Sequence, residues 1–237
     1  MIPFYFGVSD RRLYGAYDAP AGGISTKGVV ICSAVGEEYY TAHRACRLLA
    51  RQMAGVGIHA LRFDYLGTGD SDREVDEVRT EDWLDDIERA SQELMEMADL
   101  KTVGLVGLRA GAALAATVAR RTSVIDQVVW WDPVTIPKEF LAKLGPSDAP
   151  GDLPEFLEIF SKSAPEKVSP RALLVGTGPK EEVYAPLASD LAAALPDFAF
   201  VHHGERGAWE SGEDAFGSLP LPVRSLQTIT DWLRNDG

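Results

Sequence analysis

Short apolar runs alternate with amphipathic stretches along most of the chain. Residues 28–33 and 102–107 are apolar without alternation, which is typical of strands buried on both faces of a sheet. Residues 40–54 and 81–97 instead place apolar side chains at helical spacing. Because strands and helices alternate from residue 28 onward, the pattern predicts an α/β fold with a doubly wound, mostly parallel sheet.

The same patterns predict the remaining elements. Strands are expected at 28–33, 58–63, 102–107, 127–131, 172–176 and 198–202, and helices at 40–54, 81–97, 110–121, 183–195 and 222–233. Residues 4–18 alternate aromatic and polar positions, which predicts an antiparallel hairpin at a sheet edge. Residues 133–170 are rich in proline and hold two short helical patterns, at 138–144 and 155–161. We expect this segment to be a small helical cap or lid within a single domain, 1–237.

Composition narrows the classes of function. A formal net charge of -13, with the acidic residues spread along the chain, argues against nucleic-acid binding. Cys32 and Cys46 lack disulfide or metal-ligand spacing, so we expect both to be reduced and buried, as in a cytoplasmic protein. The first residues lack the features of a signal peptide. Residues 102–119 are apolar but divide into strand, turn and helix, so no membrane span is expected.

A sharp turn is predicted where the strand 102–107 meets the helix 110–121. Gly107 and Gly111 stand two residues before and two after Arg109. A strand that turns abruptly into a helix needs small residues at both places, and it holds the central residue in a strained conformation at the mouth of the sheet. This is the pattern of a nucleophile elbow, with arginine at the position of the nucleophile.

These motifs resemble the α/β-hydrolase superfamily over nearly the whole chain. Residues 64–71 (DYLGTGDS) are similar to the D-x-x-G-x-G-x-S turn of that family. Residues 36–39 (GEEY), 107–111 (GLRAG) and 131–134 (WDPV) resemble the exosortase-system-associated hydrolases and the serine-aminopeptidase-like branch. Arginine occurs at the elbow in part of that group as well. The resemblance implies an α/β-hydrolase fold.

The resemblance also implies a degenerate triad. Arg109 replaces the serine nucleophile. The acid normally follows the strand 172–176, where this chain has Pro179 or Lys180, and the base normally stands where this chain has Trp209. Serine hydrolysis needs a hydroxyl within hydrogen-bond reach of an imidazole, which arginine does not provide. Hydrolysis by a serine nucleophile is therefore not expected.

Arg109 requires an anion, because a buried guanidinium stays charged and sits here at a helix N-terminus. One candidate is Asp132, at the end of the strand 127–131, where some members of the fold place their acid. The other is a carboxylate, phosphate or oxyanion of a ligand, which would also meet the backbone N–H groups of Ala110 and Val35. The sequence leaves both open.

Other candidate residues depend on their place near this turn. His203 ends the last strand and is a candidate for proton transfer. Ser33 is a hydroxyl at a strand end, and Trp209 is a candidate wall of an apolar pocket. Glu38 either faces the pocket or favours the N-terminus of its helix.

Two hypotheses of function follow. In the first, the chain is an enzyme that acts without a serine on an acyl, ester or thioester-like substrate, free or carrier-bound, with Arg109 binding an anion and Asp132 or His203 transferring protons. In the second, it is a pseudo-hydrolase that binds a ligand or partner protein without catalysis. Neither requires a cofactor or a metal, since nucleotide-binding fingerprints and metal-ligand spacings are absent from the sequence. The oligomeric state is open.

Overall fold

The computed structural model describes residues 1–22, 25–145, 147–162, 171–209 and 220–235. Within these ranges eight strands form one sheet, in the order β1-β2-β4-β3-β5-β6-β7-β8. The strands are β1 (Ile2–Val8), β2 (Arg11–Asp18), β3 (Gly28–Cys32), β4 (His59–Phe63), β5 (Val103–Leu108), β6 (Ile125–Trp131), β7 (Arg171–Gly176) and β8 (Phe198–His202). From β4 to β8 all neighbours are parallel, as the alternating pattern predicts.

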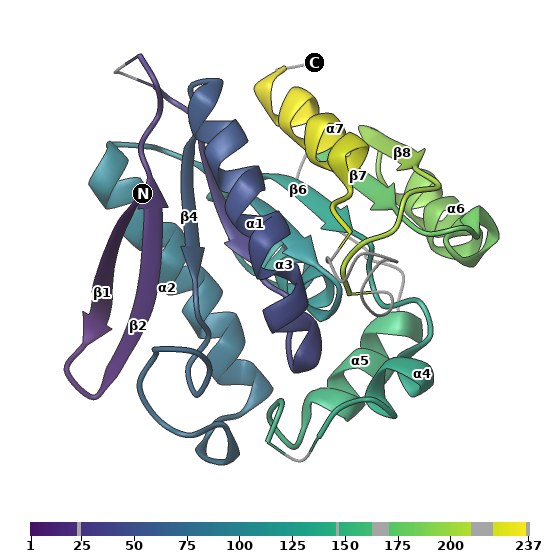
Figure 1. The fold of residues 1–237 in the computed structure, drawn as a ribbon, viewed down its shortest axis with the longest axis horizontal. Coiled ribbons are helices and arrows are strands. Elements are labelled where there is room, and N and C mark those ends of the chain that lie inside the picture. The colour runs from purple at the N-terminus through teal and green to yellow at the C-terminus, as the bar shows by residue number, and fades with distance from the viewer. Residues whose placement is uncertain (23–24, 146, 163–170, 210–219, 236–237) are drawn as a thin grey trace.

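Helices cover both faces of the sheet (Figure 1). They are α1 (Glu37–Gly55), α2 (Thr80–Ala98), α3 (Ala110–Arg121), α4 (Pro137–Leu141), α5 (Leu153–Lys162), α6 (Ala185–Ala194) and α7 (Val223–Arg234), with short 3-10 turns η1 (Val75–Glu77) and η2 (Glu181–Val183). Apolar side chains of α1 and α7 form one core layer, and those of α2, α3 and α6 form the other. This confirms the doubly wound arrangement.

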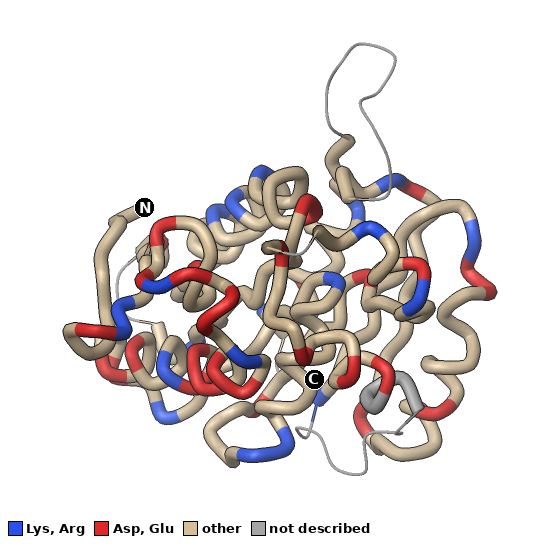
Figure 2. The backbone as a smooth tube through the Cα atoms, turned by 90° about the horizontal axis from the view of Figure 1, so that it is seen from below, with Lys and Arg blue, Asp and Glu red and all other residues tan. Residues whose placement is uncertain are grey.

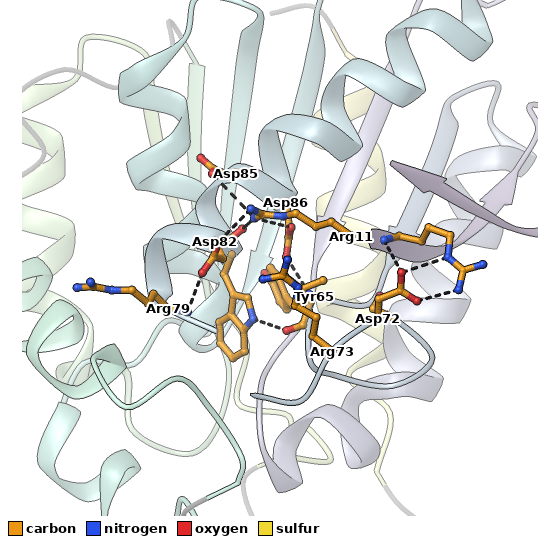
Figure 3. Close-up of polar contacts among 12 residues, drawn as sticks. Arg11, Tyr65, Asp72, Arg73, Arg79, Asp82, Asp85 and Asp86 are labelled. Atoms are coloured by element: carbon orange, nitrogen blue, oxygen red, sulfur yellow. Dashed lines mark hydrogen bonds and ion pairs between the residues drawn. The ribbon is translucent and has the colours of Figure 1, made fainter. Parts of the chain in front are cut away.

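The N-terminal hairpin lies at the edge of the sheet, as predicted. β1 pairs only with β2, and β2 joins the sheet through antiparallel pairing with β4. Side chains of the hairpin hold it to the neighbouring α2 (Figure 3): Arg11 contacts Asp82 at 3.0 Å and Asp86 at 3.4 Å. Asp86 also accepts a hydrogen bond from the Leu66 N–H, at 2.8 Å. The hairpin, α2 and the loop after β4 are thus joined through one buried carboxylate.

Most predicted elements are confirmed with small shifts at their ends. The largest shift that matters here is in α1, which begins at Glu37 rather than at residue 40. Gly36 has a φ of 62°, a conformation that glycine adopts without strain, and it lets the helix start directly after the loop. Glu37 and Glu38 occupy the first turn, where the helix dipole favours acidic side chains. The earlier start brings Glu38 close to β5 and α3.

The proline-rich segment holds two helices, α4 and α5, between β6 and β7. Predicted helices at 138–144 and 155–161 are found at Pro137–Leu141 and Leu153–Lys162, while residues 163–170 of the predicted cap lie outside the described ranges. Phe140 and Leu153 are buried against the main core. Both cysteines are free and buried. No described helix is long and apolar enough to cross a membrane.

Candidate functional site

The turn from β5 into α3, residues 107–111, is shaped by its two glycines. A Cβ at Gly107 would lie 2.4 Å from the Gly111 carbonyl oxygen, and a Cβ at Gly111 would lie 2.4 Å from the Cys32 carbonyl oxygen. Neither position has room for a side chain. Arg109, between them, has φ 57° and ψ -120°, a region that residues with a side chain rarely occupy. The chain therefore holds an arginine in a strained conformation at the carboxyl end of the central strand.

The Arg109 side chain is held by Glu38 and by Asp132. Its Nε and Nη2 donate to the two carboxylate oxygens of Glu38 at 3.0 and 3.1 Å, a bidentate geometry. Its Nη1 donates to the backbone carbonyl of Asp132 at 2.9 Å and lies 3.8 Å from the Asp132 carboxylate. The Arg109 and Glu38 side chains are only 17% and 11% exposed. The sequence leaves the counter-anion of Arg109 undecided. In the structure Glu38 makes the closest ion pair with Arg109, and the Asp132 carboxylate lies farther away.

Asp132 is a second strained and fully connected residue. It follows β6 directly, with a φ of 47°. Its carboxylate accepts hydrogen bonds from the Tyr184 hydroxyl and from the Trp209 indole N–H, and its side chain is 2% exposed. Trp209 stands where the resemblance places the base, and its indole N–H donates to the Asp132 carboxylate. Arginine, aspartate and tryptophan therefore form one connected group at the carboxyl end of the sheet.

The electrostatics of this group follow from its burial and its partners. Burial opposes the charged form of Arg109, but Asp132 and Glu38 outweigh that effect and raise the pKa of its guanidinium above the ordinary value. Burial, followed by the negative charge of Asp132, raises the pKa of the Tyr184 hydroxyl. Tyr184 is therefore protonated at neutral pH and acts as a donor to Asp132. One guanidinium thus faces two carboxylates, Glu38 and Asp132, and neutral donors from Tyr184 and Trp209 complete the hydrogen bonds of Asp132.

A cavity of about 220 Å³ lies beside Arg109. Asp132, Thr177 and Tyr184 line it together with Arg109, and apolar side chains from the start of the cap segment and from η2 complete the walls. Those apolar side chains are Pro133, Val134, Ile136, Phe140, Pro179 and Val183. The charged side chains Glu139, Lys143 and Lys180 lie around the same cavity. Apolar and polar side chains thus share its lining, and the apolar ones offer a surface for part of a small molecule.

A second, smaller cavity of about 110 Å³ lies on the other side of the first turn of α1. Val35 and Gly36 line it, together with Tyr39, Thr68 and residues of the cap segment. A Cβ on Gly36 would lie 2.8 Å from Leu144, so the cap segment packs directly on this loop. Val35 is therefore placed at this second cavity rather than at the one that Arg109 lines.

The remaining predicted residues are not all brought together. Ala110 is fully buried at the first position of α3, next to Arg109. Ser33 is buried with its side chain facing Cys46 of α1. His203 contacts Thr228 of α7 at 2.9 Å and does not line the cavity. The structure thus groups Arg109, Glu38, Asp132 and Trp209, while Ser33 and His203 lie elsewhere.

Two features of the site are missed by the sequence patterns. Tyr184, which donates to Asp132, falls at the start of the predicted helix 183–195, and no motif marks it as part of the site. The pairing of Glu38 with Arg109 depends on the early start of α1, which apolar periodicity alone does not reveal. Among the described residues, no group of three or more His, Cys, Asp or Glu side chains is arranged to hold a metal ion.

Comparison with known proteins places this geometry in a known fold. Neither family models nor curated proteins match the sequence. Among solved structures, the chain is similar to Est1E from Butyrivibrio proteoclasticus with bound ferulic acid, with a TM-score of 0.68 and 13% identity over 98% of this chain and 96% of that one.

Two further solved structures give the same result. An alpha-beta serine hydrolase homologue from Coxiella burnetii has a TM-score of 0.65 and 16% identity over 98% of this chain and 95% of that one. Mouse alpha/beta hydrolase domain-containing protein 10 has a TM-score of 0.64 and 14% identity over 98% and 97%. At such identities the likeness concerns the fold, and it agrees with the parallel sheet and its two helical layers. The chain has the α/β-hydrolase fold.

Proposed function

We propose that this protein binds a small, largely apolar molecule in the cavity beside Arg109 and does not hydrolyse it. The observation that carries the proposal is the closed hydrogen-bond network next to an open cavity. Arg109 is held in a bidentate pair by Glu38, while Asp132 is held by Tyr184 and Trp209. The reactive positions of the fold are therefore occupied by groups that satisfy one another.

The described lining of the cavity lacks the serine, cysteine and histidine of a conventional acyl-transfer site, which supports binding over catalysis. Of its hydroxyls, Tyr184 is engaged with Asp132 and its raised pKa keeps it protonated. Acyl transfer by a serine or cysteine requires an imidazole or similar base in reach, and no such pair is found among the described lining residues, whose other hydroxyls belong to Thr135 and Thr177. A ligand-binding role requires only the walls and the polar floor.

The cap segment supplies much of the binding surface. Val134, Ile136 and Phe140 come from the start of this segment, and Val183 comes from η2 on the far side of β7. Phe140 is buried and Val134 and Val183 pack against the main core, so these walls are fixed by the fold. We infer that residues 133–143, the start of this segment, act as a lid over this cavity, and that an acyl chain or aromatic ring is the part of the ligand that they cover.

Binding to a neutral apolar reporter tests this function. N-phenyl-1-naphthylamine, whose fluorescence rises in apolar surroundings, is expected to bind the wild-type protein. Val134→Trp fills part of the cavity and is expected to weaken binding at least about 10-fold, which corresponds to the loss of roughly 1.4 kcal/mol. Val223→Trp adds the same group at a position that is 59% exposed on α7 and serves as the matched control. Equal binding by Val134→Trp and the wild type would refute the proposal.

Catalysis without a serine is the second candidate, favoured by one observation. The turn at Arg109 keeps its strained φ of 57°, although an arginine that only filled space would gain nothing from that strain. A catalytic role needs Arg109 to leave Glu38 and meet an anionic substrate. Such activity would show as turnover of acyl esters or thioesters that Arg109→Met abolishes, with the fold of the variant checked by circular dichroism.

A further inference from the structure

Two lysine side chains stand on the lining of the cavity beside Arg109. Lys143 follows α4 in the cap segment, and Lys180 precedes η2 after β7. Both line the cavity and both are exposed to solvent. Within the described residues neither lysine forms an ion pair. Two lysines from separate segments thus stand beside one cavity, without an ion pair among the described residues.

This arrangement is unusual for the protein as a whole. The chain carries 36 acidic against 23 basic side chains, and acidic segments recur all over the backbone (Figure 2). A random selection of its surface would therefore be acidic. The place after β7 where the resemblance implies a carboxylate holds Pro179 or Lys180 in this chain, so no acidic side chain stands there.

The acidic side chains near the cavity do not cancel this charge equally. Asp132 is committed to Tyr184 and Trp209, and its charge is shared with Arg109. Glu38 is committed to Arg109. Glu139 is the remaining carboxylate on the lining, and it lies on α4, four residues before Lys143. Because one guanidinium faces two carboxylates in the buried group, an incoming anion would be attracted to the two lysines rather than to that group, with Glu139 as a competing carboxylate.

We propose that the ligand is a small amphiphilic carboxylic acid, whose carboxylate lies between Lys143 and Lys180 while its apolar part fills the cavity. This inference rests on the proposed function and specifies its ligand class. The apolar walls recognise the chain or ring, and the two ammonium groups select the ionised head group over a neutral one. Arg109 stays with Glu38 and forms the floor.

A matched pair of ligands tests the inference. Octanoate and octanamide have nearly the same shape and differ in charge, and each can be measured by its displacement of N-phenyl-1-naphthylamine. We expect octanoate to displace the reporter at a lower concentration than octanamide. Lys143→Ala and Lys180→Ala are each expected to weaken octanoate binding by about 2- to 5-fold, the range for an exposed charge pair. Octanamide and the reporter are expected to bind these variants as they bind the wild type.

Two further variants provide controls of sign and place. Glu139→Gln removes the competing carboxylate and is expected to strengthen octanoate binding. Lys101→Ala changes the net charge as Lys143→Ala does, but Lys101 precedes β5 at the opposite end of the sheet, so octanoate binding should not change. The loss of octanoate affinity in the lysine variants should also be smaller in roughly 0.5 M salt, because salt screens exposed charges.

The outcomes separate this inference from the proposed function. If the reporter binds in the cavity but octanoate and octanamide displace it equally in every variant, the carboxylate inference is wrong and the binding function stands. If Lys101→Ala weakens octanoate binding as much as Lys143→Ala, general surface charge explains the preference and the inference is again wrong. If the reporter does not bind the wild type, the proposed function fails and the ligand class falls with it.

Discussion

Two clusters of arginine and carboxylate side chains differ in how deeply the arginine is buried. At the turn after β5, Arg109 pairs with Glu38 in bidentate geometry at 3.0 and 3.1 Å. At the hairpin, Arg11 reaches Asp82 at 3.0 Å and Asp86 at 3.4 Å, and its side chain is 28% exposed (Figure 3). The buried partner that needs compensation is the arginine in the first cluster and the carboxylate in the second.

This difference decides what happens when a partner is lost. Arginine has no accessible neutral form, so Arg109 would remain charged in a buried site. A carboxylate escapes by taking a proton, and Asp86 is already part of the way there. Burial raises its pKa to about 6, against the opposing hydrogen bond from Leu66 and the charge of Arg11. Arg109 in the first cluster thus keeps its charge at any physiological pH, while Asp86 in the second cluster changes its charge near pH 6.

Removing Glu38 is expected to give the largest effect. Glu38→Ala leaves Arg109 without its bidentate partner and should lower the free energy of unfolding by about 3–5 kcal/mol. Arg11→Ala should cost less, about 1–2 kcal/mol, because Asp86 becomes protonated instead. Urea unfolding of both variants at pH 7 measures the difference. A smaller loss for Glu38→Ala than for Arg11→Ala would contradict the comparison.

A double variant shows how much of the stability lost in Glu38→Ala comes from leaving Arg109 without its partner. Arg109→Met with Glu38→Leu replaces both charges by apolar groups, and most of the stability lost in Glu38→Ala should return. Arg109→Met alone leaves Glu38 in its place, and Glu38 can protonate, so this variant should lose less than Glu38→Ala. If the double variant is as unstable as Glu38→Ala, the loss comes from packing and not from an isolated charge.

The second cluster predicts a pH dependence with a definite sign. The pKa of Asp86 is raised in the folded protein, from 3.8 to about 6, so the folded state binds more protons than the unfolded state between these values. Its contribution to stability is fully present below pH 3.8 and is lost as pH rises through about 6. The total loss is about 3 kcal/mol by pH 7.

Asp86→Asn tests this prediction. The amide oxygen can still accept from the Leu66 N–H, but the side chain no longer titrates. The stability of Asp86→Asn relative to the wild type should therefore rise between pH 4 and pH 7, by up to about 3 kcal/mol. Parallel pH profiles for the two proteins would contradict it. Asp85→Asn is a suitable control, because the Asp85 side chain is 56% exposed and its carboxylate lies 3.9 Å from the Arg11 guanidinium, a weak contact.

Tyr184→Phe is expected to have a small effect, no larger than that of Arg11→Ala. It removes a hydrogen-bond donor from the Asp132 carboxylate, which keeps Trp209 and Arg109 as neighbours. The loss should be about 1–2 kcal/mol in thermal or urea unfolding. Tyr40→Phe, at a position that is 75% exposed, serves as the control and should change little. No difference between the two variants would show that Tyr184 does not support Asp132.

The fold was accessible from the sequence because its signals are local. Apolar runs mark the strands of the parallel sheet, and the α3 boundaries are those predicted, Ala110 and Arg121. Gly107 and Gly111 mark the turn because their Cβ positions are blocked by backbone atoms. Such steric requirements act within a few residues or between adjacent strands, so spacing along the chain reveals them.

The chemistry of the site was less accessible because it depends on contacts between distant residues. Glu38 and Arg109 lie 71 residues apart, and Trp209 and Asp132 lie 77 apart. Asp132 was a candidate partner of Arg109, and it does contact Arg109, but Glu38 is the stronger partner. The prediction of His203 as a proton-transfer group finds no support in its position, since its ring meets Thr228 of α7. Side-chain direction at a strand end is set by tertiary packing, which periodicity does not encode.

One assay tests the central claim most directly: p-nitrophenyl octanoate is added to the protein loaded with N-phenyl-1-naphthylamine. The ester should displace the reporter from the cavity, and release of p-nitrophenolate should be no faster than with Val134→Trp, whose cavity is partly filled. That result is binding without turnover. Release that is faster than in Val134→Trp, or an initial burst, would show an acyl-transfer site and contradict the account, as would failure of the ester to displace the reporter.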